Sequence, residues 1–375
     1  MNVGFYNPIN LDLKIEFPTL NDFELDKLQY LIHLIYEQKA LYRIKTEFVP
    51  LKAVYLRKIL RDHKHYRDLL EIASIIQCDY IYVKNSKSFG LKLTDKYSTQ
   101  HYKKIPIRTE KIKTKIQAGK IDLDLCDKTH RFLLENLKKI SIDYESASQL
   151  LNPNELESFT SDKIRLKKIL EKDWFFKQDK YGRIHTNITT LTSKYRQFLS
   201  VNDEHLVNID IRNSQPLFLL IALNNIINNN TIRCALLPTK EELEKYSTLV
   251  QQGSIYEFFS DVYGCDRSTT KKKIFMEMFS KTISKEFRDI FPNLSFILDY
   301  LKGKDYRRVA WMMQREESKL MINQVCGDLA SQNIFLATIH DSILTTKQNV
   351  EAVKTTILDR FSDLRIIPTL KIENS

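Results

Sequence analysis

The most regular alternation of hydrophobic and polar residues lies at 206–211. Alternate positions of a strand face opposite sides, so this pattern predicts a strand with one buried face. Ser214 can then cap a helix that Pro216 starts. Asp210 therefore lies near the end of a strand, just before a strand-to-helix turn. A carboxylate there could hold a metal on a rigid element, or it could simply solvate the turn.

Patterns of both kinds recur in the C-terminal part of the chain. The predicted elements are helices over 267–280 and 310–332, strands over 334–339 and 342–346 that meet at His340-Asp341, a helix that begins after Asn349, and a strand over 366–372. This mixture of helices and strands predicts an α+β fold.

The N-terminal part predicts a smaller module. Asn21 can cap a helix, two more helices are expected over 50–60 and 65–73, and a hairpin is expected from strands at 80–83 and 90–93. Two helices followed by a basic hairpin look like a winged helix, which would contact phosphates or serve as a protein scaffold. Asp22-Phe23-Glu24 has the Asp-x-Glu form of proofreading exonucleases, but acidic residues also suit a helix start, so no exonuclease is expected.

Composition narrows the class of partner. The chain has 375 residues, with 58 Lys and Arg against 47 Asp and Glu, so its net charge is +11. This balance favours a polyanionic partner, although an anionic membrane surface would also fit. The longest apolar run, 217–223, is far shorter than the roughly 20 residues that span a bilayer. We expect no membrane and no signal peptide.

The cysteines show no paired spacing. They are Cys78, Cys126, Cys234, Cys265 and Cys326. Neither a zinc site nor a disulfide framework is expected, which suits a reducing cytoplasm.

Candidate chemistry lies in the predicted helix over 267–280. Arg267, Lys271, Phe275 and Phe279 recur every fourth residue and so share one face. The cationic half of that face suits the phosphates of a nucleoside triphosphate, and the aromatic half suits stacking on a base. The alternative is an amphipathic helix with both Phe residues in the core. Asp341, at the predicted hairpin turn, could bind a metal or could serve the turn alone.

Three segments, in chain order, resemble the motifs of family A DNA polymerases and of their relatives, the single-subunit phage-type RNA polymerases. Gly182-Arg183-Ile184-His185, the following Arg196 and the segment 206–215 are similar to the approach to motif A and to motif A itself. Arg267-x3-Lys271-x3-Phe275-x3-Phe279 is similar to the motif B helix, and Ile339-His340-Asp341-Ser342 to motif C. The resemblance covers roughly residues 181–346, and three weak motifs in register make a stronger signal than any one.

The resemblance implies a division of the chain. It implies a right-hand polymerase palm with small fingers over 176–375 and a helical thumb-like segment with a basic linker over 101–175. The N-terminal winged-helix-like module would occupy 1–100.

The resemblance also implies roles for single residues. Asp210 and Asp341, with the backbone carbonyl of Ile211, would hold two Mg²⁺ ions, or Mn²⁺ in their place. The other implied roles are phosphate binding by Arg267 and Lys271, with Lys271 as proton donor; stacking by Phe275; a sugar site at Gln215 and Phe279; primer-terminus contact by His340; and nucleic-acid contact by Arg183, Arg196 and Lys272.

Two departures from the motifs affect the expected preference for deoxyribose or ribose in the nucleotide. Gln215 stands where the DNA enzymes have a Glu that excludes ribose, and Phe279 stands where both lineages usually have Tyr. The implied function is template-directed DNA synthesis without proofreading, for a phage, plasmid or mobile element, on a DNA (or RNA) primer-template with nucleoside triphosphates. RNA or primer synthesis is the alternative within the superfamily. A non-catalytic DNA-binding replication or regulatory protein is the alternative outside it.

Overall fold

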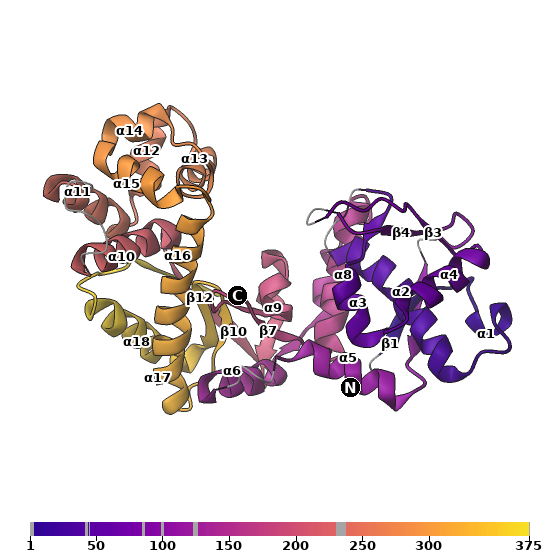
Figure 1. The fold of residues 1–375 in the computed structure, drawn as a ribbon. Helices are drawn as coiled ribbons and strands as arrows, with labels where there is room; N and C mark the ends of the chain where they lie inside the picture. The colour runs from indigo at the N-terminus through magenta and orange to yellow at the C-terminus, as the bar shows by residue number, and fades with distance from the viewer. Residues whose placement is uncertain are drawn as a thin grey trace. The chain divides into compact units, whose positions relative to one another are not determined.

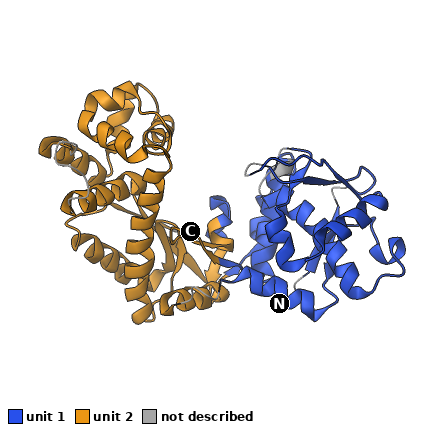
Figure 2. Ribbon diagram, viewed as in Figure 1, with its two compact units in different colours: residues 1–122, 141–176, 190–198 blue, residues 123–140, 177–189, 199–375 orange. Residues whose placement is uncertain are grey.

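The structure is a computed structural model that describes residues 4–41, 44, 46–84, 87–98, 101–122, 127–229 and 238–374. It divides into two compact units (Figure 2). Unit 1 comprises residues 1–122, 141–176 and 190–198, and unit 2 comprises 123–140, 177–189 and 199–375. The predicted thumb-like segment is therefore split, because 101–122 and 141–176 belong to unit 1 and 123–140 belongs to unit 2.

Unit 1 is built mainly from helices with short strands. Its elements are β1 (Gly4–Pro8), α1 (Leu13–Glu16), α2 (Asp22–Leu41), β2 (Val49–Pro50), α3 (Ala53–Ile59), α4 (His63–Ile72), β3 (Ile76–Cys78), β4 (Gly90–Leu93), β5 (Tyr102–Pro106), α5 (Glu110–Lys120), β6 (Ser141–Ile142), α7 (Tyr144–Gln149), α8 (Leu156–Leu170) and the 3₁₀ helix η2 (Ser193–Phe198). β1 pairs with β5, and β2, β4 and β3 form a small antiparallel sheet.

The core of unit 1 surrounds α2. Leu25, Leu28, Ile32 and Ile35 recur at helical spacing and are almost fully buried. The helix starts with a reciprocal cap, because the Asn21 side chain accepts from the Glu24 amide and the Glu24 carboxylate accepts from the Asn21 amide, both at 3.1 Å. Glu24 of the Asp-x-Glu sequence thus has a structural role at this helix start.

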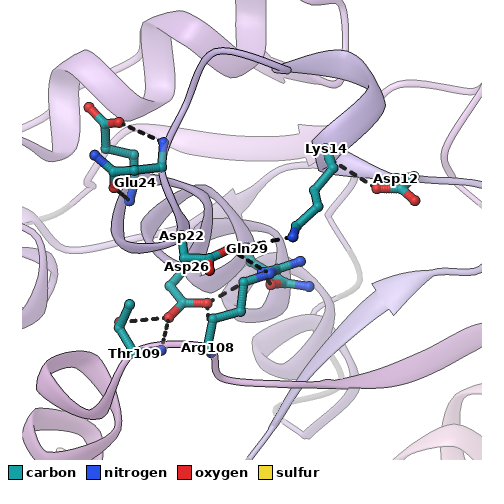
Figure 3. Close-up of polar contacts among 9 residues, drawn as sticks. Asp12, Lys14, Asp22, Glu24, Asp26, Gln29, Arg108 and Thr109 are labelled. Atoms are coloured by element: carbon teal, nitrogen blue, oxygen red, sulfur yellow. Dashed lines mark hydrogen bonds and ion pairs between the residues drawn. The ribbon is translucent and has the colours of Figure 1, made fainter.

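A buried carboxylate fixes the chain ahead of α5. Asp26, fully buried on α2, accepts hydrogen bonds from the Arg108 and Thr109 amides and from the Thr109 hydroxyl (Figure 3). Arg108 also pairs with Asp26 and donates to Gln29. Because a buried charge is costly unless it is paired and hydrogen-bonded, this arrangement is best understood as structural.

The predicted hairpin strand at 80–83 is wrong in position. The strand that pairs with β4 is β3, four residues earlier. It ends because the Asp79 side chain accepts from the Ile81 and Gly90 amides and Tyr80 takes a positive φ of 50°. Tyr80, Ile81, Tyr82 and Val83 consequently lie exposed in the connecting loop. Asn85 and Ser86 of the predicted turn, like Cys126 and Cys234, lie outside the described residues.

Unit 2 combines a sheet with many helices (Figure 1). Its elements are α6 (Lys128–Lys139), β8 (Ile184–Thr186), α9 (Asn187–Thr190), β9 (Leu199–Val201), β10 (Glu204–Ile211), α10 (Ser214–Asn228), α11 (Lys240–Gln251), α12 (Ile255–Tyr263), α13 (Arg267–Phe279), α14 (Lys285–Ile290), α15 (Pro292–Lys302), α16 (Arg308–Glu317), the π-helix η4 (Ser318–Val325), α17 (Cys326–Ser331), β11 (Ala337–Ile339), β12 (Ser342–Thr346), η5 (Lys347–Asn349), α18 (Val350–Ser362) and β13 (Leu370–Asn374). β7 (Phe176–Gln178), at the unit boundary, pairs with β8.

The strand β10 is the centre of the sheet in unit 2. It pairs antiparallel with β12 along one edge and with β13 along the other, and it forms a hairpin with β9. The two residues of that hairpin turn, Asn202 and Asp203, both have positive φ, as a type I′ turn requires. β11 pairs with β12 at the sheet edge.

Helices bury the apolar surface of this sheet. α18 packs against β10 and β12, and α6 packs against β11. Residues 216–223 of α10 are apolar and buried on all sides of the helix, as expected for a helix in the interior. In Figure 1, α12 to α15 gather at one end of unit 2, where α13 and α15 contact α16.

The fold class is confirmed as a mixture of helices and strands. The single helix predicted over 310–332 is instead three consecutive helical segments, α16, η4 and α17. No helix in the described part of the chain is long and apolar enough to cross a membrane.

Candidate functional site

Two aspartates are brought together by strand pairing. Asp210 lies near the end of β10, opposite Ser342 at the start of β12. Asp341 immediately precedes Ser342, so the register places both aspartates at the same end of two neighbouring strands. They are separated by 130 residues in sequence, and the antiparallel pairing of β10 with β12 alone accounts for their proximity.

The residue before the second aspartate, His340, has a left-handed backbone conformation. Ile339 pairs with Ser342, which leaves His340 and Asp341 as a two-residue hairpin turn. His340 has a φ of 55°, a conformation that costs energy for a residue other than glycine. Strained backbone of this kind gathers at functional sites, and here it is the residue directly before Asp341.

Both aspartates line one cavity of unit 2. The cavity has a volume of about 370 Å³ and is lined by residues from the end of β10, the start of α10, α12, α13, the β11–β12 turn and β13. Of the residues that the sequence singled out, it contains Asp210, Ile211, Arg267, Lys271, Phe275 and Asp341. Three of the four residues of the predicted face of α13, Arg267, Lys271 and Phe275, therefore line the same cavity as the two carboxylates.

The helix α13 begins where it does because of its cap. The Asp266 side chain accepts from the Ser268 and Thr269 amides, so the first turn starts at Arg267. Arg267 donates to Glu257 at 2.6 Å and lies over the ring of Tyr256. Lys271, one turn further on, lies 5.6 Å from the ring centre of Phe275.

The two aspartates of the cavity repel each other electrostatically. Burial and then the charges of Asp341 and Glu373 raise the pKa of Asp210 to about 6, while Lys271 and Lys371 oppose this rise. The cations at the border of the cavity therefore offset the negative charge of this pair only in part. A bound divalent cation would relieve the repulsion between the carboxylates.

The donors fit a hard cation. Carboxylate and carbonyl oxygens are the ligands that Mg²⁺ prefers, and Mg²⁺ commonly binds through one or two carboxylates together with substrate phosphates and water. Asp210, Asp341 and the main chain of Ile211 supply only such donors. Among the described residues, no cluster of three or more His, Cys, Asp or Glu side chains is arranged to hold a metal. A two-carboxylate site completed by substrate is the arrangement that this donor set allows.

Solved structures that resemble this chain include one distant polymerase domain. The POL domain of Pol1 from M. smegmatis, solved in complex with DNA primer-template and dNTP, is similar with a TM-score of 0.41 and 10% sequence identity. The match covers 62% of this chain, which spans 56% of that structure's chain. No family model matches the sequence, and no curated protein matches it.

Three predicted residues meet at a network beside the cavity instead of inside it. The Arg183 guanidinium donates to both carboxylate oxygens of Glu317, through Nε at 2.8 Å and through Nη2. The Gln215 amide nitrogen donates to the same carboxylate at 3.0 Å. His340 lines a small neighbouring cavity that also contains Arg183 and Glu317. Gln215 is thus held by Glu317 and does not line the larger cavity.

A close backbone approach makes this network possible. Gly182 has a φ of +93°, and a Cβ atom there would lie 2.9 Å from the Cβ of Ser318. The turn that carries Arg183 therefore packs directly on the first residue of η4, next to Glu317. Asp179 stabilises the turn by accepting from the Tyr181 and Arg183 amides.

The remaining predicted residues lie elsewhere. Phe279 contacts Phe275 edge to face, with ring centres 5.7 Å apart, and is not in the cavity lining. Lys272 is exposed on α13. Arg196 belongs to unit 1, where it donates to the Leu191 carbonyl.

Sequence reasoning missed several residues of the site. Tyr256, Glu257, Arg212 and Lys371 line the cavity. Lys371 had a detectable signal, because it lies on the predicted closing strand and pairs directly with Asp210. Glu317 had none, since an isolated carboxylate within a helical pattern is normally a solvated position.

Proposed function

We propose that unit 2 is a template-directed nucleotidyltransferase, and specifically a DNA polymerase that extends a primer on a DNA template with deoxynucleoside triphosphates. The observation that carries this proposal is one cavity that presents Asp210 and Asp341 opposite Arg267 and Lys271. Phosphoryl transfer needs this combination, because catalysis is largely positioning and charge stabilisation around a polyphosphate.

Each residue has a specific task in this proposal. Asp210 and Asp341 would hold two Mg²⁺ ions, with the Ile211 carbonyl as a further ligand. Ions bound there would lower the pKa of the primer 3′-hydroxyl and neutralise charge on the phosphates. Arg267 and Lys271 bind the β- and γ-phosphates, and Lys271 can deliver a proton to the leaving pyrophosphate. Phe275 offers a ring for the incoming base.

The cations are preorganised for this task. Arg267 is held by Glu257 and by the Tyr256 ring, so its guanidinium is already placed at the cavity. Lys271 is close enough to Asp210 to lower that carboxyl's pKa. A triphosphate that binds between the helix and the aspartates would therefore meet groups that need little rearrangement.

Ribonucleotide incorporation is a second candidate, supported by the state of Gln215. Its amide nitrogen donates to Glu317, so the side chain is neutral and anchored away from the cavity lining. A carboxylate facing the sugar, which would repel or block a 2′-hydroxyl, is absent at this position of the chain. Primer extension with either dNTPs or rNTPs distinguishes the two substrates directly.

Our first prediction concerns the two aspartates. Asp210→Asn and Asp341→Asn should each lower the rate of nucleotide incorporation at least a hundredfold, because each removes a charge that the cation needs. The measurement is extension of a labelled primer on a DNA template with Mg²⁺, and binding of the same primer-template should change little.

A matched control is Glu351→Gln, which neutralises an exposed carboxylate on α18 outside the cavity and should keep full activity. Normal primer extension by either aspartate variant would contradict the proposal. The reaction would then not depend on that aspartate, and the proposed two-aspartate site would not be its centre.

A further inference from the structure

A second cavity, in unit 1, has a different chemistry. It opens between α3, the start of α4 and the loop that follows β3, and has a volume of about 130 Å³. Its floor is apolar, with Leu51, Leu56 and Phe89, and its rim carries Lys64, Arg67 and Tyr82. We call this cavity the α3–α4 groove. An apolar slot with a cationic rim suits a flat ring attached to an anion.

Exposed tyrosines lie on the elements that form the α3–α4 groove, and one of them, Tyr82, is part of its lining. Tyr55 on α3 is 61% exposed, and Tyr82 on the loop is 63% exposed with its ring edge against Phe89. Tyr80 is 58% exposed, with Arg67 over its ring. Large rings in water cost free energy, and a group of them around one groove marks an interaction surface.

The charge around the groove is positive. Residues 52–89 contain eight Lys and Arg and four Asp and Glu. Two of the acids already pair with Arg67 and one with Lys87. The cations without an ion pair to any described residue, all exposed, are Lys52, Arg57, Lys58, Arg61, Lys64 and Lys84.

The pKa of His63, which lines the groove, reflects this positive charge. Burial lowers its pKa below the usual range, and the charges of Arg57, Arg67 and Lys64 lower it further. Those three cations are therefore close together at one side of the groove. Such a cluster repels itself and is relieved by a polyanion.

We propose that the α3–α4 groove of unit 1 binds single-stranded nucleic acid, with unpaired bases stacked on Tyr55 and Tyr82 and the phosphates held by Arg57 and Lys64. Stacking needs a free base face, which a duplex does not offer, so the tyrosines select single strands. The cations follow the backbone without regard to sequence. This site is separate from the proposed reaction centre, and each can fail without the other.

The test measures binding of a labelled oligothymidylate to the full chain by fluorescence anisotropy, without nucleotides. Tyr82→Ala and Tyr55→Ala should each weaken binding about tenfold, which is the usual loss of one stacked base. Tyr300→Ala is the matched control, since Tyr300 on α15 of unit 2 is similarly exposed at 55% and should have no effect. All three positions are exposed, so the variants should fold, and their melting temperatures should match that of the parent chain.

The salt dependence separates phosphate contacts from stacking. Lys64→Gln and Arg57→Gln should each reduce the slope of log affinity against log salt by about one, while the tyrosine variants should keep the slope. Lys240→Gln, an exposed lysine in unit 2, should leave both affinity and slope unchanged.

Crosslinking identifies the site itself. An oligonucleotide that carries 5-bromouracil should crosslink, on irradiation, to a peptide that contains Tyr55 or Tyr82. Crosslinks confined to unit 2, or unchanged affinity in the Tyr55→Ala Tyr82→Ala double variant, would overturn the proposal. So would equal displacement of the oligonucleotide by polyglutamate of the same charge, because the groove would then bind acidic protein segments as readily as nucleic acid.

Discussion

The Glu317 carboxylate accepts hydrogen bonds from two side chains that come from distant parts of unit 2. Glu317 is 1% exposed, Arg183 reaches it from the turn before β8, and Gln215 reaches it from the first turn of α10. Burial raises the pKa of Glu317 and Asp341 adds to this, whereas the bonds from Arg183 and Gln215 oppose it. Arg183 and Gln215 thus partly offset the free-energy cost of burying this carboxylate.

Removal of the Glu317 charge should lower the free energy of unfolding substantially. Glu317→Gln leaves the Arg183 guanidinium largely buried without its partner, and breaking a buried pair from one side typically costs about 3–5 kcal/mol. We expect thermal unfolding of the full chain to show a melting temperature lower by several degrees. Glu351→Gln, at an exposed ion pair, should change stability by less than about 0.5 kcal/mol.

The double variant Glu317→Leu Arg183→Met makes the test sharper. Replacing both charged partners with apolar side chains of similar size is often neutral or stabilising, so this variant should recover much of the lost stability. If the double variant were as unstable as Glu317→Gln, the ion pair would not be the source of the loss.

At the scale of elements, the junction between β10 and α10 depends on one backbone conformation. Asn213 has φ 53° and ψ 33°, which is left-handed, and it is the cap residue of α10. It lies in the lining of the larger cavity, three residues after Asp210. Asn tolerates this region better than most residues, and glycine tolerates it best.

Asn213→Gly and Asn213→Ala separate the backbone requirement from the side chain. Glycine removes the whole side chain but fits the left-handed conformation, so it should cost little stability. Alanine retains a Cβ and should lose roughly 1–2 kcal/mol. Chemical denaturation of both variants measures the difference. Equal stability of the two, or a more stable alanine variant, would show that the conformation at residue 213 does not limit stability.

The elements around the cavity could be predicted from local sequence signals. The strand predicted at 206–211 is β10, and the helix predicted at 267–280 is α13, because alternation and a capping Asp266 act over short distances. The tight turn at His340-Asp341 is also as predicted. These three elements carry the residues that the motifs singled out, and the structure brings Asp210, Asp341, Arg267 and Lys271 to one cavity.

Features that depend on tertiary contacts could not be predicted. The π-helix η4 has the same apolar spacing as an α-helix, and the close contact of Gly182 with Ser318 is visible only in three dimensions. The strand expected at 80–83 failed because the Asp79 side chain ends β3 early. High β-propensity at Tyr80, Tyr82 and Val83 reflects a preference for a half-buried pleated surface, and these residues are instead exposed in the loop.

At the scale of the whole molecule, acid should destabilise unit 1 through one charge network. Unit 1 contains a partly buried charge network in which Glu37 pairs with Lys168 of α8 and lies 3.6 Å from His33, one turn earlier on α2. The Tyr6 amide of β1 donates to the Nδ1 atom of His33 at 3.2 Å. This bond requires His33 to keep Nδ1 unprotonated, so protonation of the ring conflicts with the folded arrangement.

The direction of the pH effect follows from both groups. Burial lowers the pKa of His33 to about 4, and Lys168 adds to this while Glu37 opposes it. Burial opposes ionisation of Glu37, but Lys168 and His33 outweigh it and lower its pKa to about 2. In the unfolded chain both groups bind protons at higher pH. The stability they provide is complete above pH 6.5 and is lost as the pH falls, first through His33 and then, below about 4.5, through Glu37.

Unit 1 should therefore lose roughly 2–3 kcal/mol of stability between pH 6.5 and pH 4 through His33 alone. The chain has two tryptophans, Trp174 in unit 1 and Trp311 in unit 2. In a Trp311→Phe background, fluorescence of the buried Trp174 reports unfolding of unit 1.

His33→Asn retains an acceptor near the Nδ1 position but cannot titrate, so its stability should be lower at neutral pH and nearly independent of pH above 4.5. His65→Asn, at an exposed histidine of α4, should keep the parent slope, and an unchanged slope in His33→Asn would rule out this network as the origin of acid sensitivity.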